Sequence, residues 1–291
     1  MLAKPISALR RRTSEGMEEF MNSSRMRTCV FATIVGAVLF ATGSSADHSW
    51  NGYHWARTTN PFTLKTGDNV DVKWDAYLDE AISDWNRSPE LTLVKVAGGT
   101  KPRNCRPTAG RIEACNASYG NTGWLGIAQI WITGGTHITQ GVTKLNDTYF
   151  NTATYNTPAW RRLVTCQEIA HDFGLDHQDE NFDNPNLGSC MDYTSDPDGP
   201  PSNEHPNNHD YAELSSIYAH LDNFTTIGAV LPSSAPGAMS DLDVDGPGQW
   251  GRLARSTRNG RGQTYELDFG RGYRVVTHVL WADPDRDGRN R

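Results

Sequence analysis

Two histidines and a carboxylate, spaced within eleven residues, could hold a metal ion and use it for hydrolysis. The stretch from Gln167 to His177 reads Gln-Glu-Ile-Ala-His-Asp-Phe-Gly-Leu-Asp-His. Gln167 and His171 are one helical turn apart, so they share a face and can meet one ion, with Glu168 beside them. His177 reaches that ion only if the helix ends and the chain turns back, which Gly174 permits. Three ligands and an open position are typical of catalytic zinc, where a neighbouring carboxylate serves as general base.

The same residues resemble the zinc signature of the metzincin peptidases, H-E-x-x-H-x-x-G-x-x-H, with Gln167 in place of the first His. A second segment, Gly188–Tyr193, resembles the Met-turn of that family. Its Met191 follows His177 by 14 residues, at the spacing the family uses. The resemblance implies that Met191 forms an apolar floor beneath the metal and that Tyr193 lies near it.

The resemblance covers residues 60–222 and implies an α+β fold. We expect a twisted, mostly parallel sheet with an antiparallel edge strand, an active-site helix, the Met-turn and a C-terminal helix near residues 210–218. The segment Gly123–Ala128 resembles the edge strand that pairs with an extended polypeptide substrate, although an ordinary sheet edge would have the same pattern.

The activity implied by the resemblance is that of a secreted zinc-dependent endopeptidase. His171 and His177 would bind Zn²⁺, and Gln167 would contribute its amide oxygen or leave its position to water. Glu168 would act as general base on the water that attacks the peptide bond. Tyr193 would ligate the metal or steady the oxyanion.

The Gln at the first ligand position keeps other functions open. An uncharged amide should bind zinc less well than imidazole does. The chain would then be a pseudoprotease, catalytically weak or inactive, that acts as a peptide- or matrix-binding module. Alternatively, His205 or His209, which are four residues apart, would supply the missing ligand.

Composition and the N-terminal residues indicate export. The 291-residue chain has a net charge of −7, and nothing in it suggests nucleic-acid binding. The basic residues Arg25 and Arg27, the apolar run 29–41 and the small residues up to Ala46 are typical of a signal peptide cleaved after Ala46. An N-terminal membrane anchor is the alternative, and Met21 or Met26 are alternative start sites. We expect a secreted, extracellular monomer without stable membrane insertion after signal cleavage.

Four cysteines outside the signal region suit an oxidising compartment. Their spacing favours a local Cys105–Cys115 disulfide. The remaining pair, Cys166–Cys190, would tie the active-site helix to the Met-turn. Metal ligation by the Cys166 thiolate is the alternative.

The chain divides by composition into four parts. These are an N-terminal extension with the signal peptide (1–46), a catalytic domain (47–228), a linker (229–249) and a short β-rich C-terminal segment (250–291). Periodicity predicts helices at 75–86 and 157–173 and strands at 69–73, 91–96, 111–119, 124–132 and 136–145. Carboxylates in the loops 179–186 and 196–208 could hold structural Ca²⁺, or could simply be solvated.

Overall fold

The computed structural model describes residues 48–240, 242 and 246–287, so the predicted signal peptide (1–46) lies outside the described residues. The described chain is α+β, with a mixed sheet and few helices. In chain order, the elements are β1 (His54–Trp55), β2 (Phe62–Asn69), α1 (Asp75–Trp85), β3 (Leu91–Ala97), β4 (Ile112–Ala117), β5 (Trp124–Thr133), β6 (His137–Asn146), α2 (Asp147–Phe150), α3 (Pro158–His171), α4 (Asn208–Ile217), α5 (Gly237–Ser240), the 3₁₀ helix η1 (Pro247–Gln249), β7 (Arg252–Ser256), β8 (Gly262–Gly270), β9 (Tyr273–Trp281) and α6 (Pro284–Asp287).

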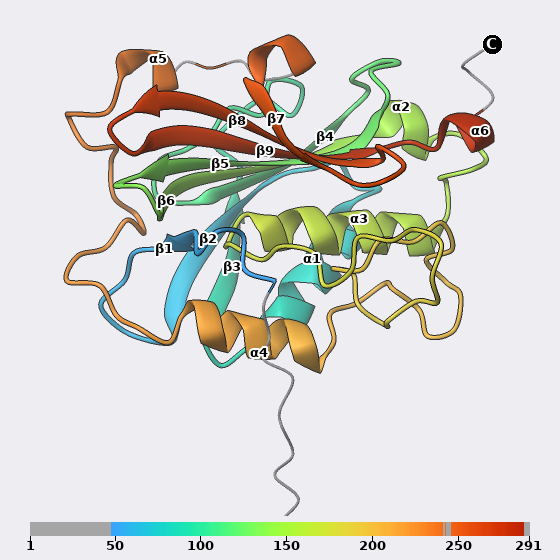
Figure 1. Cartoon of the computed structure of the whole chain (residues 1–291), viewed down its shortest axis with the longest axis horizontal. Coiled ribbons are helices and arrows are strands. Elements are labelled where there is room, and N and C mark those ends of the chain that lie inside the picture. Colours follow the sequence, from blue (N-terminus) through green and yellow to red (C-terminus); the bar gives the residue numbers. More distant parts are fainter. Residues whose placement is uncertain (1–47, 241, 243–245, 288–291) are drawn as a thin grey trace, which may run out of the picture. The chain divides into compact units, whose positions relative to one another are not determined.

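The strands form one sheet in the order β3-β2-β4-β6-β5-β9-β8-β7, and the short β1 also pairs with β6 (Figure 1). The pairings among β1, β2, β3, β4 and β6 are parallel. Every pairing that involves β5, β7, β8 or β9 is antiparallel. The sheet therefore has a parallel half from the first part of the chain and an antiparallel half completed by its last strands.

Helices α1 and α3 pack together on one face of the sheet (Figure 1). Helix α3 begins as its sequence predicts, because the Thr157 side chain accepts a hydrogen bond from the Trp160 backbone and Pro158 takes the first helical position. Trp85 of α1 is fully buried, and its Nε1 donates to the Cys166 carbonyl of α3 at 3.1 Å. This packing fixes α3 against the sheet.

The last strands bury a second apolar cluster on the opposite face of the sheet. It joins Trp124 and Trp131 of β5, Val275 and Val279 of β9, and Trp250. Residues 250–281 thus belong to the same sheet as the rest of the described chain.

The expectation that residues 123–128 form an exposed sheet edge is wrong. Strand β9 pairs antiparallel with β5 from Trp124↔Trp281 to Ile132↔Arg274. Without β9, the outer edge of β5 would leave a row of N–H and C=O groups without partners. Strand β9 satisfies these groups, and the pairing also buries its two apolar faces. The place predicted for an extended peptide is occupied by the chain's own strand.

Both predicted disulfides occur in the structure. Cys105 is bonded to Cys115 and Cys166 to Cys190, with Cα–Cα distances of 5.9 and 6.0 Å. Cys166 is therefore not a thiolate ligand. Within the described residues, no helix combines the length and apolar character needed to span a bilayer. The two disulfides are consistent with an extracellular protein.

Candidate metal centre

Helix α3 and the turn after it position the two predicted histidines. The helix ends at His171, and Gly174 follows with a φ of +97°, which side chains rarely adopt. A Cβ on Gly174 would lie 2.0 Å from the Tyr53 carbonyl oxygen, so a side chain there has no room. The glycine turn brings His177 back beside His171, with ring centroids 4.6 Å apart.

Three imidazoles converge at this point. Ligand nitrogens of His171, His177 and His278 all lie within 4.8 Å of one another. His171 Nδ1 lies 2.7 Å from the Leu175 carbonyl oxygen, and because that oxygen only accepts, Nδ1 must donate. The lone pair of His171 Nε2 is therefore free for a metal, in the way that outer hydrogen bonds orient metal-binding imidazoles.

The third imidazole, His278, comes from β9 and was not predicted as a site residue. It is the Cα partner of Ala128 on β5, so the two side chains leave the sheet on the same face. That face is the one under α3, because a Cβ on Gly126, two residues earlier, would lie 2.8 Å from Glu168 Cγ. The register of β9 against β5 therefore places the His278 side chain beside His171 and His177.

His278 is held between Glu168 and Tyr193. Its Nδ1 lies 3.0 Å from Glu168 Oε2, and its Nε2 lies 2.8 Å from the Tyr193 hydroxyl. All three side chains are buried. Burial raises the pKa of Glu168 to about 8, because the charged carboxylate loses its solvation by water there. In this conformation the Glu168 carboxyl is protonated at neutral pH.

The histidines of the centre are in the form that binds metals. Burial lowers the pKa of His177 and of His278 to about 3, and the pKa of His171 falls well below its usual value for the same reason. Neutral imidazoles are the ligating form. The Nε2 atoms of His171 and His177 are buried and have no hydrogen-bond partner among the described residues, a costly arrangement that a coordinated metal would relieve. The donor set suits zinc and other imidazole-preferring metals.

No protein-family model matches the chain, and no curated protein is significantly similar to it. The likeness to metzincins therefore consists of the residues of the two motifs and their spacing. The convergence of the three histidines is an observation independent of that likeness, because His278 belongs to neither motif.

Segments from both ends of the described chain close the centre. The Trp50 ring lies 5.1 Å from the His171 ring. A Cβ on Gly262 of β8 would lie 2.2 Å from the Tyr193 hydroxyl oxygen, so the hairpin rests directly on that tyrosine. The β8–β9 hairpin and the Trp50 segment therefore leave the three imidazoles and Glu168 buried.

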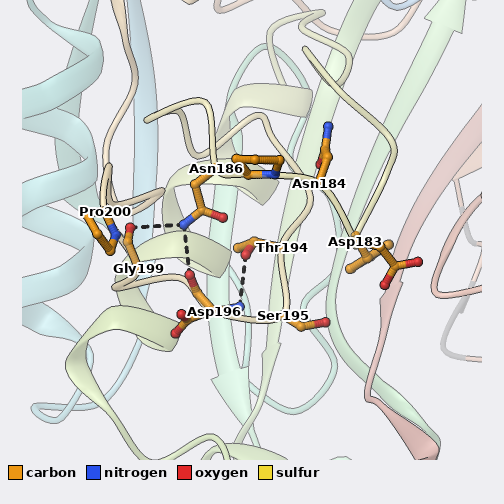
Figure 2. A pocket seen from close by; sticks show the side chains of 10 residues that line it. Asp183, Asn184, Asn186, Thr194, Ser195, Asp196, Gly199 and Pro200 are labelled. Atoms are coloured by element: carbon orange, nitrogen blue, oxygen red, sulfur yellow. Dashed lines mark hydrogen bonds between the residues drawn. The ribbon is translucent and has the colours of Figure 1, made fainter.

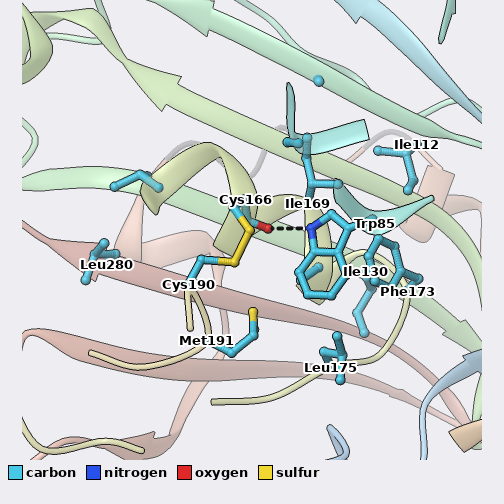
Figure 3. Packing of buried hydrophobic residues seen from close by; sticks show 14 of the residues in the cluster. Trp85, Ile112, Ile130, Cys166, Ile169, Phe173, Leu175, Cys190, Met191 and Leu280 are labelled. Atoms are coloured by element: carbon cyan, nitrogen blue, oxygen red, sulfur yellow. Dashed lines mark hydrogen bonds between the residues drawn. A yellow bond between two sulfur atoms is a disulfide. The ribbon is translucent and has the colours of Figure 1, made fainter. Parts of the chain in front are cut away.

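Gln167 is buried beside the disulfide, and its Nε2 donates to the Cys190 carbonyl at 2.9 Å. Its Oε1 has no hydrogen-bond partner among the described residues. Met191 is fully buried next to the Cys166–Cys190 disulfide (Figure 3). The disulfide thus joins α3 to the Met191 turn, at the two places where the motifs lie.

The two histidines weighed as replacement ligands, His205 and His209, are not in the cluster. His205 Nδ1 instead lies 2.7 Å from Asp84 Oδ2, and the His209 ring stacks on His48 with centroids 5.1 Å apart. Both lie near the start of α4. The third imidazole comes from β9 instead.

A pocket of about 240 Å³ opens between the loops expected to hold calcium (Figure 2). Hydrogen bonds from Asn186 Nδ2 to the Asp196 and Gly199 carbonyls, at 2.8 and 3.1 Å, join the two loops. Among the described residues, Glu180 is the only member of these loops in a group of three that could hold a metal, together with Asp176 and His177. Calcium in these loops stays a prediction.

The signal that could have found His278 is a weak one. It is one of nine histidines and, together with Thr277, it interrupts the apolar run Val275–Trp281. A histidine on an otherwise buried strand needs a partner for its ring nitrogens. The sequence alone does not name that partner, because the partner lies 110 residues away at Glu168.

Proposed function

We propose that this protein is a secreted zinc-dependent endopeptidase and that the described conformation is its closed form. The observation that carries the proposal is the convergence of His171, His177 and His278 on one buried point beside Glu168. In the closed form three neutral imidazoles would hold zinc beside the Glu168 carboxyl, and opening would replace His278 with water and leave His171, His177 and the Gln167 position as the catalytic donor set. A zinc ion held here supplies a Lewis acid and lowers the pKa of water.

The other catalytic roles belong to Glu168 and Tyr193. Glu168 accepts a proton from the attacking water and returns it to the departing amine, once opening restores solvent and a normal pKa. The Tyr193 hydroxyl donates a hydrogen bond to the oxyanion that forms from the substrate carbonyl. Both groups are engaged by His278 in the closed form, so His278 occupies the place where water and the substrate carbonyl would meet them.

The strand that carries His278 occupies the substrate's place as well. An extended peptide paired with β5 would run where β9 runs, and β9 already takes the backbone partners of residues 124–132. The ion pair between Arg255 of β7 and Asp176, with Nη2–Oδ2 at 2.6 Å, strengthens this closure. We therefore expect low hydrolysis by the intact chain and higher hydrolysis when the hairpin is displaced.

A pseudoprotease with a self-filled groove is the second candidate, and the same β5–β9 pairing favours it. The two candidates differ in whether Glu168 ever turns over substrate. Zinc content by elemental analysis and casein-type hydrolysis by the mature chain, with and without Glu168→Gln, test the first candidate.

For the peptidase, we expect zinc bound to both proteins and a loss on the order of 10²–10⁴-fold in rate for the Glu168→Gln variant. The hydrolysis assay includes a protein loosened by Gly262→Ala, so that closure does not hide activity. Equal rates with and without Glu168→Gln in that protein would overturn the mechanism. Zinc binding without any hydrolysis would favour the pseudoprotease.

A further inference from the structure

A second group of metal-ligand side chains lies away from α3. Strand β1 pairs with the start of β6, and His54 and His137 are Cα partners in this pairing. His220 and Asp222 follow α4 and reach the same place. Donor atoms of His54, His137 and Asp222 lie within 4.8 Å of one another, and His220 Nε2 lies 3.2 Å from His54 Nε2. We call these four residues the second cluster.

The distances that involve His54 Nε2 and Asp222 Oδ1 in the second cluster are close to those around a tetrahedral ion. Zinc bonds of about 2.0–2.1 Å in a tetrahedron place neighbouring donors about 3.3–3.4 Å apart. The His54–His220 nitrogens are 3.2 Å apart. Asp222 Oδ1 lies 3.3 Å from His137 Nε2 and 3.6 Å from His54 Nε2.

The surrounding residues aim the lone pairs inward. His54 Nδ1 donates to the Gly52 carbonyl at 2.7 Å, so its Nε2 is an acceptor. Asp222 Oδ2 accepts from the backbone N–H of Arg57 at 3.1 Å and from its Nη1 at 3.2 Å, which turns Oδ1 toward the imidazoles. Carbonyl and charged partners of this kind orient metal ligands.

We infer that the second cluster is a structural metal site: His54, His137 and Asp222 converge as ligands of a zinc-type ion, and His220, which lies beside His54, moves in to complete the set. Three imidazoles and a carboxylate form a closed tetrahedral set without an open position, which is typical of structural rather than catalytic zinc. The exposed His220 leaves a path for the ion from solvent.

The ion would join three parts of the chain that are far apart in sequence. His54 and His220 are 166 residues apart and belong to the N-terminal strand and to the segment after α4. The residues just before His54 include Trp50, whose ring covers His171. Metal at the second cluster would therefore hold in place the segment that closes one side of the first centre.

The competing interpretation is a hydrogen-bonded histidine cluster that binds no metal. In that case His220 Nε2–H donates to His54 Nε2, and the 3.2 Å distance needs no ion. Metal counting on the full mature chain separates the two interpretations. The probes are Zn²⁺, measured by elemental analysis after dialysis, and Co²⁺, whose visible absorption reports tetrahedral coordination.

We expect two equivalents of Zn²⁺ per chain, one of which is lost in the His137→Gln/Asp222→Asn variant. His171→Gln/His177→Gln should lose the other equivalent, and Co²⁺ bound to that variant should still absorb as a tetrahedral complex. His220→Gln is a milder variant at an exposed position and should weaken the same equivalent. His205→Gln, a histidine outside both clusters, serves as the matched control and should keep both.

Failure of this inference and failure of the proposed function give different results. One equivalent, lost only with His171→Gln/His177→Gln, would overturn the second site and leave the first. One equivalent, lost only with His137→Gln/Asp222→Asn, would overturn the first and support the second. A chain that binds no Zn²⁺ would overturn both.

Discussion

Glu168 and His278 form the contact on which the chemistry of the first centre depends. The 3.0 Å separation between Glu168 Oε2 and His278 Nδ1 keeps the carboxyl engaged while the centre is closed. The same imidazole contacts Tyr193 at 2.8 Å. One side chain thus controls the base, the hydroxyl and a metal-binding position together.

The His278→Ala variant should separate those three roles. We expect zinc to be held at least tenfold more weakly, about 1.4 kcal/mol, because two histidines and an amide remain. At saturating zinc, hydrolysis should rise above that of the parent, because Glu168 and Tyr193 lose the group that occupies them. Chelator competition and initial rates measure the two effects. Unchanged zinc affinity would mean that His278 does not ligate the metal.

Gln167 offers a way to restore a third imidazole without closing the centre. Its Oε1 has no hydrogen-bond partner among the described residues, and it shares a helix face with His171. In a His278→Ala background, Gln167→His should recover most of the lost zinc affinity and keep the higher hydrolysis. Titration with a chromophoric chelator compares the double and single variants. Equal affinities in the two would show that position 167 does not face the metal.

Among the secondary-structure elements, the β8–β9 hairpin closes the first centre, and it does so by pairing β9 with β5. The strand pairing contributes backbone hydrogen bonds, and Val279 and Leu280 are buried on opposite sides of the sheet. Closure therefore depends on the fit of a whole hairpin. A substitution that pushes β8 outward should weaken closure without replacing a proposed metal ligand or catalytic residue.

Gly262→Ala is such a substitution, because its Cβ would meet the Tyr193 hydroxyl at 2.2 Å. Overpacking of this kind typically costs about 1–3 kcal/mol, so the open population should rise roughly fivefold to a hundredfold. We expect hydrolysis at saturating zinc to rise in proportion. Gly248→Ala is the matched control, because nothing lies within 4 Å of its added Cβ. A rate equal to that of the control would argue against closure by the hairpin.

At the scale of the whole molecule, buried carboxyls make stability depend on pH. Asp210 is fully buried at the start of α4, where it accepts hydrogen bonds from Ser189 Oγ and the Asn207 backbone. Burial raises its pKa from 3.8 to about 6. The folded chain then binds its proton more tightly than the unfolded chain does. The free energy of unfolding contributed by this group is largest below pH 4 and falls as pH rises toward 6.

In the Asp210→Asn variant, the free energy of unfolding should no longer fall as pH rises, because the amide oxygen keeps both hydrogen bonds without a charge. Two pKa units correspond to about 3 kcal/mol, so the variant should gain up to that much on the parent between pH 4 and pH 7. Urea unfolding at several pH values measures the difference. Asp198→Asn, at an exposed position, serves as the control and should follow the parent. A constant difference across pH would contradict the assignment to Asp210.

Local patterns in the sequence determined the parts of the fold that depend on near neighbours. Thr157 and Pro158 predicted the start of α3, and the cysteine spacing predicted the local Cys105–Cys115 disulfide. The first strand was misplaced at 69–73. It lies at 62–69 instead, because its pairing with β3 and β4 rather than its own alternation decides its position.

Local spacing was enough to predict that Glu168, His171 and His177 lie together, because the helix period and a glycine turn set distances over one or two turns. Only the tertiary structure decided that His278 joins them. Ala128 and His278 are paired across 150 residues. That pairing follows from which strand edge is open and which faces of β9 need burial, and these are properties of the assembled sheet rather than of any local pattern.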